Sequence, residues 1–95
     1  MGERSFYVLA YDISDDRRRA KIARAMETVA DRVQGSVFEA YLTPVELERL
    51  LRQVQKVLDL EADTLRVYLL CESCRPKLRT LGVGKATPPP GLMIV

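Results

Sequence analysis

The sequence contains no histidine, and cysteine accounts for only 2 of its 95 residues. Without histidine the chain lacks the commonest general base, the commonest zinc ligand and every histidine-based catalytic triad. Any catalysis must therefore rest on carboxylates, a bound metal ion and arginines.

Membrane and export signals are also missing. No stretch is long and apolar enough to cross a membrane, and no signal peptide opens the sequence. We therefore expect a cytoplasmic protein with no membrane partner. A chain of 95 residues with 47% hydrophobic residues fits one small folded domain rather than a disordered chain. Because its core is modest, dimerisation would add useful burial.

The two cysteines, Cys71 and Cys74, form a single C-x-x-C motif. A zinc site usually has four ligands, and the chain offers neither a second cysteine pair nor a histidine. Thioredoxin-type pairs lie at a helix N-terminus, whereas this pair lies where a strand is expected to end. We interpret the motif as two reduced cysteines, with a zinc site between subunits as the alternative.

The most informative feature is an apolar segment that ends in a carboxylate and leads into a cationic helix. Ser5 to Tyr11 is rich in aromatic and β-branched residues, which predicts a buried strand ending at Asp12. A carboxylate at a strand end can bind a hard cation such as Mg²⁺. The net charge of +2 does not by itself indicate a nucleic-acid binder, but the next residues concentrate the cations that can bind phosphates: Arg17, Arg18, Arg19, Lys21 and Arg24.

We expect this helix to begin at an N-cap Ser14 and to run to about residue 30. At 100° per residue, one face carries a cationic stripe made of Arg17, Lys21 and Arg24. Arg19 lies about half a turn away, so we predict that it points back over the strand end. The alternative is that the cations form an ordinary solvated helix face.

The remaining pattern predicts an α+β domain. Residues 31–42 contain two short extended pieces joined near Gly35. Thr43-Pro44-Val45-Glu46 has the residues of a capping box and opens a helix with a continuous apolar stripe. A strand is expected from Thr64 to Cys71, and a short one near residues 81–84. This order of elements is that of the ferredoxin-like βαββαβ arrangement.

The C-terminal segment differs from the rest of the chain. Residues 88–91 are Pro-Pro-Pro-Gly, a stiff spacer, and residues 92–95 are apolar. We predict a ferredoxin-like domain over residues 1–87 and a segment, 88–95, that adds as an edge strand to the partner subunit of a homodimer. The alternative is a tail packed on its own subunit.

The Y-D-I strand end, the R-R-x-K helix, the R-V-Q-x-S-V-F-E hairpin and the apolar tail together resemble the CRISPR-associated protein two ("Cas-two") family. The resemblance covers nearly the whole chain. It implies a ferredoxin-like homodimer that exchanges its C-terminal strands, binds prespacer DNA and partners the CRISPR integrase during spacer acquisition. It also implies a metal-dependent endonuclease or endoribonuclease, with either single-stranded RNA or double-stranded DNA as substrate.

The resemblance assigns roles to particular residues. Asp12 is the implied metal ligand and catalytic carboxylate, and two copies in a dimer would hold Mg²⁺, or Mn²⁺ in its place. Arg19 is the second implied catalytic residue. The nuclease site and its surround further include Tyr11, Lys21, Arg32 and Phe38. The cation cluster of the helix and the resemblance together give the predicted nucleic-acid contacts, which are Arg17, Arg18, Lys21, Arg24 and Arg32.

Two alternatives to these roles stay open. Asp12 has a purely structural reading, as a strand-end carboxylate that accepts hydrogen bonds near the helix start. The aromatic residues fit core and interface positions better than stacking platforms for bases. At the level of the whole chain, the alternative function is a ferredoxin-like regulatory dimer that binds a small ligand.

Overall fold

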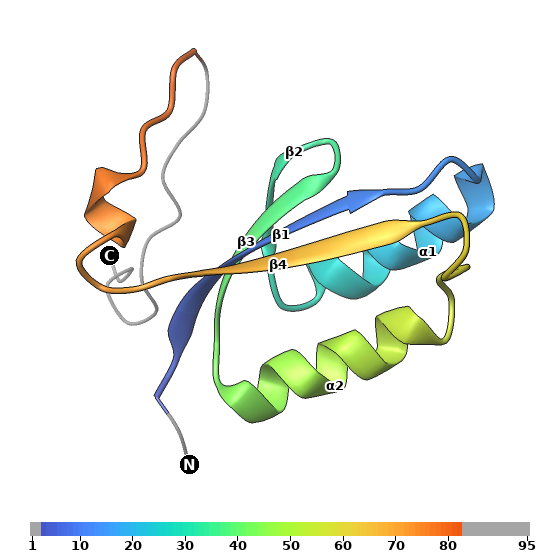
Figure 1. The fold of residues 1–95 in the computed structure, drawn as a ribbon, viewed down its shortest axis with the longest axis horizontal. Coiled ribbons are helices and arrows are strands. Elements are labelled where there is room, and N and C mark those ends of the chain that lie inside the picture. The colour runs from blue at the N-terminus through green and yellow to red at the C-terminus, as the bar shows by residue number, and fades with distance from the viewer. Residues whose placement is uncertain (1–2, 83–95) are drawn as a thin grey trace.

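The computed structural model describes residues 3–82, which form an antiparallel sheet covered on one face by two helices (Figure 1). The elements in chain order are β1 (Ser5–Asp12), α1 (Asp16–Glu27), β2 (Asp31–Gln34), β3 (Val37–Leu42), α2 (Pro44–Gln55), β4 (Thr64–Leu70) and the short 3₁₀ helix η1 (Arg75–Lys77). The 4-stranded sheet has the order β2-β3-β1-β4. The predicted α+β, ferredoxin-like fold is confirmed.

The central strand β1 separates a core face from an open face of the sheet. Tyr7, Leu9 and Tyr11 alternate onto the side of the helices and belong to the main hydrophobic cluster, in which Leu9 is fully buried. Leu9 is opposite Phe38 on β3 and Val67 on β4. Successive strand residues point to opposite faces. Asp12, the residue after the core residue Tyr11, therefore lies on the open face.

The open face is apolar near the end of β4. The rings of Phe6 and Tyr41 lie 5.0 Å apart between their centroids, and Tyr68 remains 47% exposed. This part of the open face therefore presents an aromatic side chain, Tyr68, to the surroundings.

Helix α2 begins as predicted. Thr43 is the N-cap, Pro44 is the first helical residue, and Thr43 and Glu46 exchange the two hydrogen bonds of a capping box. Leu50 and Val54 are buried, with Leu47, Val57 and Leu58 packed against the core. The apolar stripe read from the sequence is therefore the surface by which α2 covers the sheet.

The hairpin between β2 and β3 is also confirmed. A shift of register between Arg32 and Gln34 marks a bulge, and Gly35 and Ser36 form the turn. The strand expected near residues 81–84 does not form at Leu81 or Gly82. Its remainder, the boundary at residue 87 and the segment 88–95 lie outside the described residues. Among the residues described, no helix is long and apolar enough to span a membrane.

Candidate functional site

The candidate site is built around Asp12 at the end of β1. Asp12 is exposed and is paired through its backbone with Thr64, the first residue of β4. Within residues 3–82 no side chain or backbone group forms a hydrogen bond or ion pair with its carboxylate. The structural reading of Asp12 as a hydrogen-bonded strand-end carboxylate thus finds no support in this part of the chain. Its two oxygens are available to an external ligand.

Helix α1 begins one residue later than the sequence analysis predicted. The N-cap is Asp15, not Ser14, because Asp15 has the extended backbone of a cap and its carboxylate accepts a hydrogen bond from the backbone N–H of Arg18 at 2.9 Å. Asp16 then occupies the first turn, where a carboxylate is favourable at the positive end of the helix. Both residue types are good N-caps, so only the backbone geometry separates them.

Arg19 points back toward the strand end, as predicted. Its guanidinium donates hydrogen bonds to the carbonyl oxygens of Ile13 at 2.9 Å and Ser14 at 3.3 Å. It also forms a close ion pair with Asp16. Since Ile13 and Ser14 directly follow Asp12, Arg19 fixes the loop that positions the candidate metal-binding carboxylate.

Arg18 has a different partner, which sequence reasoning did not identify. Its guanidinium donates to both carboxylate oxygens of Asp63, at 2.7 and 3.1 Å, and the Asp63 side chain has an exposed fraction of 0%. Asp63 also accepts a hydrogen bond from the backbone N–H of Asp59 at 2.9 Å. The hydrogen bonds from Arg18, more than any other cause, lower the pKa of Asp63.

The Arg18–Asp63 pair joins the first turn of α1 to the loop before β4. Residues 45 positions apart in the sequence meet here, so no local spacing could have predicted the contact. Asp63 resembles the exposed acids around it in sequence and differs only in burial. Of the predicted nucleic-acid contacts, Arg18 is therefore one whose guanidinium is already engaged within the chain.

The remaining cations of α1 form the basic stripe, which we define as Arg17, Lys21 and Arg24. All three side chains are exposed, and none forms an ion pair with another residue of the range 3–82. At a rise of 1.5 Å per residue, the stripe spans about 10 Å along the helix, roughly three steps of 3.4 Å along one DNA strand. The stripe can therefore follow a phosphate backbone.

Tyr11, Arg32 and Phe38, predicted as parts of the site and its surround, do lie together, but on the helix-covered face of the sheet. The guanidinium of Arg32 lies 5.4 Å from the Phe38 ring centroid and donates to the Gly35 carbonyl oxygen at 2.7 Å. It also donates to the Tyr11 hydroxyl at 3.4 Å, and Tyr11 donates to Gly35 at 3.2 Å.

The burial of these aromatic rings decides between their two readings. Phe38 is 0% exposed and Tyr11 is 4% exposed, so neither presents a ring face on which a base could stack. Their contacts instead hold the turn of the β2–β3 hairpin beside the end of β1. The interpretation of Tyr11 and Phe38 as core residues is confirmed.

Asp12 is the candidate metal ligand among the described residues. Within residues 3–82, no group of three or more histidine, cysteine, aspartate or glutamate residues gathers where a metal ion could bind. An exposed, unpaired carboxylate such as Asp12 suits Mg²⁺, which keeps several waters and commonly takes only one or two protein carboxylates. The donor chemistry fits Mg²⁺, but one chain contributes a single carboxylate.

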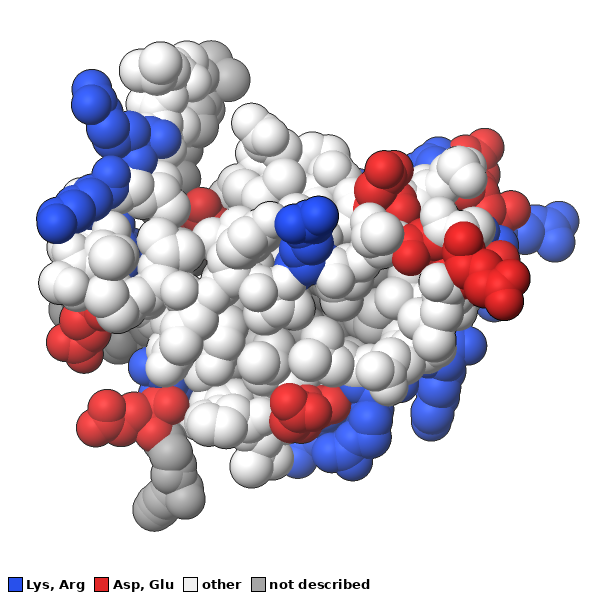
Figure 2. All heavy atoms as spheres, in the orientation of Figure 1, with Lys and Arg blue, Asp and Glu red and all other residues white. Residues whose placement is uncertain are grey.

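Charged groups of both signs surround the end of the molecule that carries Asp12. In Figure 2, acidic and basic side chains gather where α1 and β4 begin, whereas the middle of this face is largely uncharged. Asp12, the start of α1 and the Arg18–Asp63 pair all belong to that end. A polyanion approaching the basic stripe would therefore also meet local acids, unless a cation offsets them.

Comparison with known proteins places this geometry in a family. A family model described as CRISPR associated protein Cas2 matches residues 5–78. A protein of Chloroflexus aurantiacus named CRISPR-associated endoribonuclease Cas2 1 is 43% identical over 90% of this chain and 89% of its own length. A Thermus thermophilus protein named CRISPR-associated endonuclease Cas2 2 is 45% identical over 88% of each chain.

Solved structures share the fold of this chain. The crystal structure of a hypothetical protein from Thermus thermophilus superimposes with a TM-score of 0.79 and 43% identity, over 86% of this chain and 95% of that one. A chain of a partial Cas6-RT-Cas1–Cas2 complex superimposes with a TM-score of 0.75 and 26% identity, over 95% of this chain and 99% of that one.

Proposed function

Because the chain belongs to the CRISPR-associated protein Cas2 family, we propose that it acts in CRISPR adaptation as a homodimer that binds prespacer DNA and bridges integrase subunits. The observation that carries this proposal is the basic stripe: Arg17, Lys21 and Arg24 are exposed and have no ion-pair partner among residues 3–82. Cations that are not neutralised within the chain can replace the counterions of a nucleic acid.

Two stripes in a dimer would strengthen the interaction without making it sequence-specific. Each phosphate neutralised by a lysine or arginine releases counterions, so the contributions of the two subunits add and depend steeply on salt. Phosphate contacts position a protein on a duplex but do not read bases. This suits a protein that must hold prespacers of many sequences.

The integrase partner is supported by the neighbour whose name places Cas1 and Cas2 in one complex. Its chain covers 95% of this one at a TM-score of 0.75, so the similarity extends over the whole ferredoxin-like domain rather than over a shared motif. We infer that this chain assembles with a Cas1-type integrase through the same domain.

A spacer-acquisition assay in cells tests the adaptation proposal. Replacing Arg17, Lys21 and Arg24 with glutamine should reduce acquisition strongly. The matched control places glutamine at Arg49, Arg52 and Lys56. These are also two arginines and one lysine, and they are exposed on or next to α2. This control should keep acquisition near the wild-type level. Equal loss in both variants would contradict a specific role for the stripe.

We propose a second, enzymatic activity: metal-dependent cleavage of a phosphodiester, centred on Asp12. In a symmetric dimer, two Asp12 carboxylates would repel each other, and a divalent cation between them would relieve that repulsion. Mg²⁺ bound there would supply a Lewis acid for the phosphodiester. Support comes from the exposed, unpartnered state of Asp12 within residues 3–82 and from the nuclease names of the relatives.

In this proposed site Arg19 first acts as a positioning residue. Its hydrogen bonds to Ile13 and Ser14 hold the loop after Asp12 in place. Its ion pair with Asp16 keeps one end of the guanidinium away from a substrate, so a direct contact with phosphate requires exchange of that partner. The basic stripe would hold the nucleic acid alongside.

A cleavage assay on single-stranded RNA and on duplex DNA, with Mg²⁺ or Mn²⁺, tests the nuclease. Asp12→Asn should abolish cleavage, whereas Asp31→Asn, which changes another exposed strand aspartate, should leave it unchanged. If Asp12→Asn loses cleavage but retains spacer acquisition, the nuclease is accessory to the adaptation role. Cleavage by Asp12→Asn at the wild-type rate would contradict the assignment of Asp12. Absence of any nucleic-acid affinity at moderate salt would favour the regulatory-dimer alternative instead.

A further inference from the structure

The C-x-x-C motif takes no part in the function proposed above, yet its geometry is distinctive. The carbonyl oxygen of Cys71 accepts hydrogen bonds from the backbone N–H groups of Cys74 at 3.0 Å and Arg75 at 2.9 Å. Residues 71–75 thus form a tight turn between β4 and η1. In such a turn the Cα atoms of the first and fourth residues lie within about 7 Å, close to the separation that a disulfide needs.

Both thiols are free and exposed, so reagents in solution can reach them. The Sγ atom of Cys71 lies 3.1 Å from the Ser73 hydroxyl. The pKa of the Cys71 thiol is lowered to about 7. The largest cause is the hydrogen bond from the Ser73 hydroxyl, and hydrogen bonds from Cys74 contribute less. The hydrogen bond to Cys71 and the nearby sulfur charge raise the pKa of Cys74.

The two thiols therefore differ in a way that is useful for disulfide exchange. The attacking thiol works best as a thiolate with a pKa near the ambient pH, and its neighbour then resolves the mixed disulfide. Cys71 fits the first role and Cys74 the second. A mononuclear metal site is less well supported, because no third ligand joins the pair among residues 3–82.

We propose that Cys71 and Cys74 form a redox-active dithiol that exchanges with low-molecular-weight disulfides, with Cys71 as the attacking thiol. The Cys71 thiolate attacks one sulfur of the small disulfide, which forms a mixed disulfide and releases one small thiolate. Cys74 loses its proton to solvent and attacks Cys71 Sγ, which closes the Cys71–Cys74 bond and releases the second small thiolate. The two cysteines lose two electrons, and the small disulfide gains them and takes up two protons.

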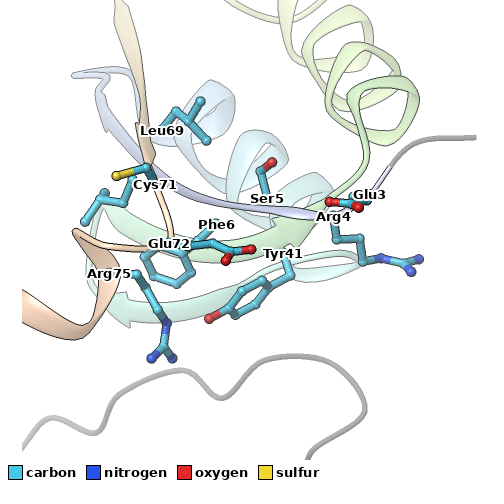
Figure 3. Close-up of a pocket in the computed structure, with 10 residues that line it drawn as sticks. Glu3, Arg4, Ser5, Phe6, Tyr41, Leu69, Cys71, Glu72 and Arg75 are labelled. Carbon is cyan, nitrogen blue, oxygen red and sulfur yellow. The ribbon is translucent and has the colours of Figure 1, made fainter.

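The position of the pair connects this chemistry to the open face of the sheet. Cys71 and Arg75 line the same pocket, of about 490 Å³, together with Phe6 and Tyr41 (Figure 3). The Arg75 guanidinium lies 5.3 Å from the Phe6 ring centroid and 5.6 Å from that of Tyr41. A disulfide would constrain the turn that carries Arg75, so oxidation would act on the wall of this pocket.

The test follows the thiols of the reduced full-length chain by intact mass after reaction with glutathione disulfide and acid quenching. The wild-type chain should end two hydrogens lighter, as a disulfide within one chain, at a rate whose half-maximum lies near the Cys71 pKa of about 7. Cys74→Ser should stop at the mixed disulfide with one glutathionyl group. Cys71→Ser should react about tenfold more slowly at pH 7.

Ser73→Ala supplies a finer control, because it removes the hydroxyl that contacts Cys71 while keeping both thiols. The pH midpoint of its reaction should move upward. Equal rates for the two cysteine variants would overturn the proposal, as would disulfides formed only between chains. Binding of one zinc ion by two chains, with all thiols protected from alkylation, would overturn it in favour of the intersubunit zinc site.

Discussion

Helices α1 and α2 have the same length, 12 residues, and cover the same face of the sheet, but they are fixed in different ways (Figure 1). The start of α2 is fixed locally, by the capping box of Thr43 and Glu46 and by Pro44. The start of α1 has a local cap from Asp15 and local contacts from Arg19, but Arg18 also ties it to Asp63, 45 positions away in the sequence.

The two helices also differ in charge. The sequence of α1 contains five cations and two carboxylates, whereas that of α2 contains two of each. On α1, Arg18 and Arg19 hold the structure, which leaves the basic stripe exposed. Helix α2 covers the sheet, whereas α1 covers it and also carries the exposed basic stripe that we propose binds a polyanion.

The largest effect on stability should come from breaking the Arg18–Asp63 ion pair, which joins α1 to the loop before β4. Asp63→Asn removes the negative charge that faces Arg18 in a buried position. We expect the thermal unfolding midpoint to fall by roughly 5–10 °C, since the partly buried Arg18 then loses its two close hydrogen bonds to Asp63 and keeps only the longer 3.9 Å ion pair with Asp15. Differential scanning calorimetry measures this. The control Glu61→Gln changes an exposed acid in the same loop and should leave the midpoint unchanged.

The same pair should make stability depend on pH in a predictable direction. The pKa of Asp63 is lowered in the folded chain, so its carboxylate stabilises the fold at pH values above its ordinary pKa of about 3.9. That contribution is lost as the pH falls through the folded value. Urea unfolding of wild type and Asp63→Asn should show a constant difference between about pH 5 and 8 that shrinks below about pH 4. A difference that grows in acid would contradict the pairing.

A smaller effect should come from the local start of α2. Thr43→Ala removes the side chain that accepts the Glu46 N–H hydrogen bond at 3.1 Å. The expected loss in the free energy of unfolding is about 1 kcal/mol, as for other N-cap threonines. Urea unfolding at neutral pH measures it. If this change destabilised the chain more than Asp63→Asn, the contrast between a local and a tertiary start would be wrong.

This contrast also explains which features the sequence could predict. The start of α2 follows from residue types within one turn, so Thr43, Pro44 and Glu46 identified it. The direction of Arg19 follows from helix geometry alone and was correct. The start of α1 was misplaced by one residue, because Ser14 and Asp15 are both suitable caps and only the backbone geometry selects one.

Long-range contacts were beyond sequence reasoning for a physical reason. Arg18 and Asp63 meet only because β1 and β4 pair and bring the start of α1 beside the loop before β4. Arg32 was predicted near the site, and it does meet Tyr11 and Phe38, but its hydrogen bonds to Gly35 depend on the bulge in the hairpin. The sequence was enough to predict the chemistry of individual residues, whereas their contact partners could be identified only from the folded structure.

The central claim is that α1 carries the polyanion-binding surface. Its most direct test is to measure how the affinity for duplex DNA depends on salt in variants that lack the cations of α1 and in variants that lack those on or next to α2. Glutamine at Arg17, Lys21 and Arg24 should weaken binding and reduce the slope of log K against log salt by about 3 for each subunit engaged. Glutamine at Arg49, Arg52 and Lys56 should leave both affinity and slope nearly unchanged. Equal slopes for the two variants would contradict the account that α1 carries the polyanion-binding surface.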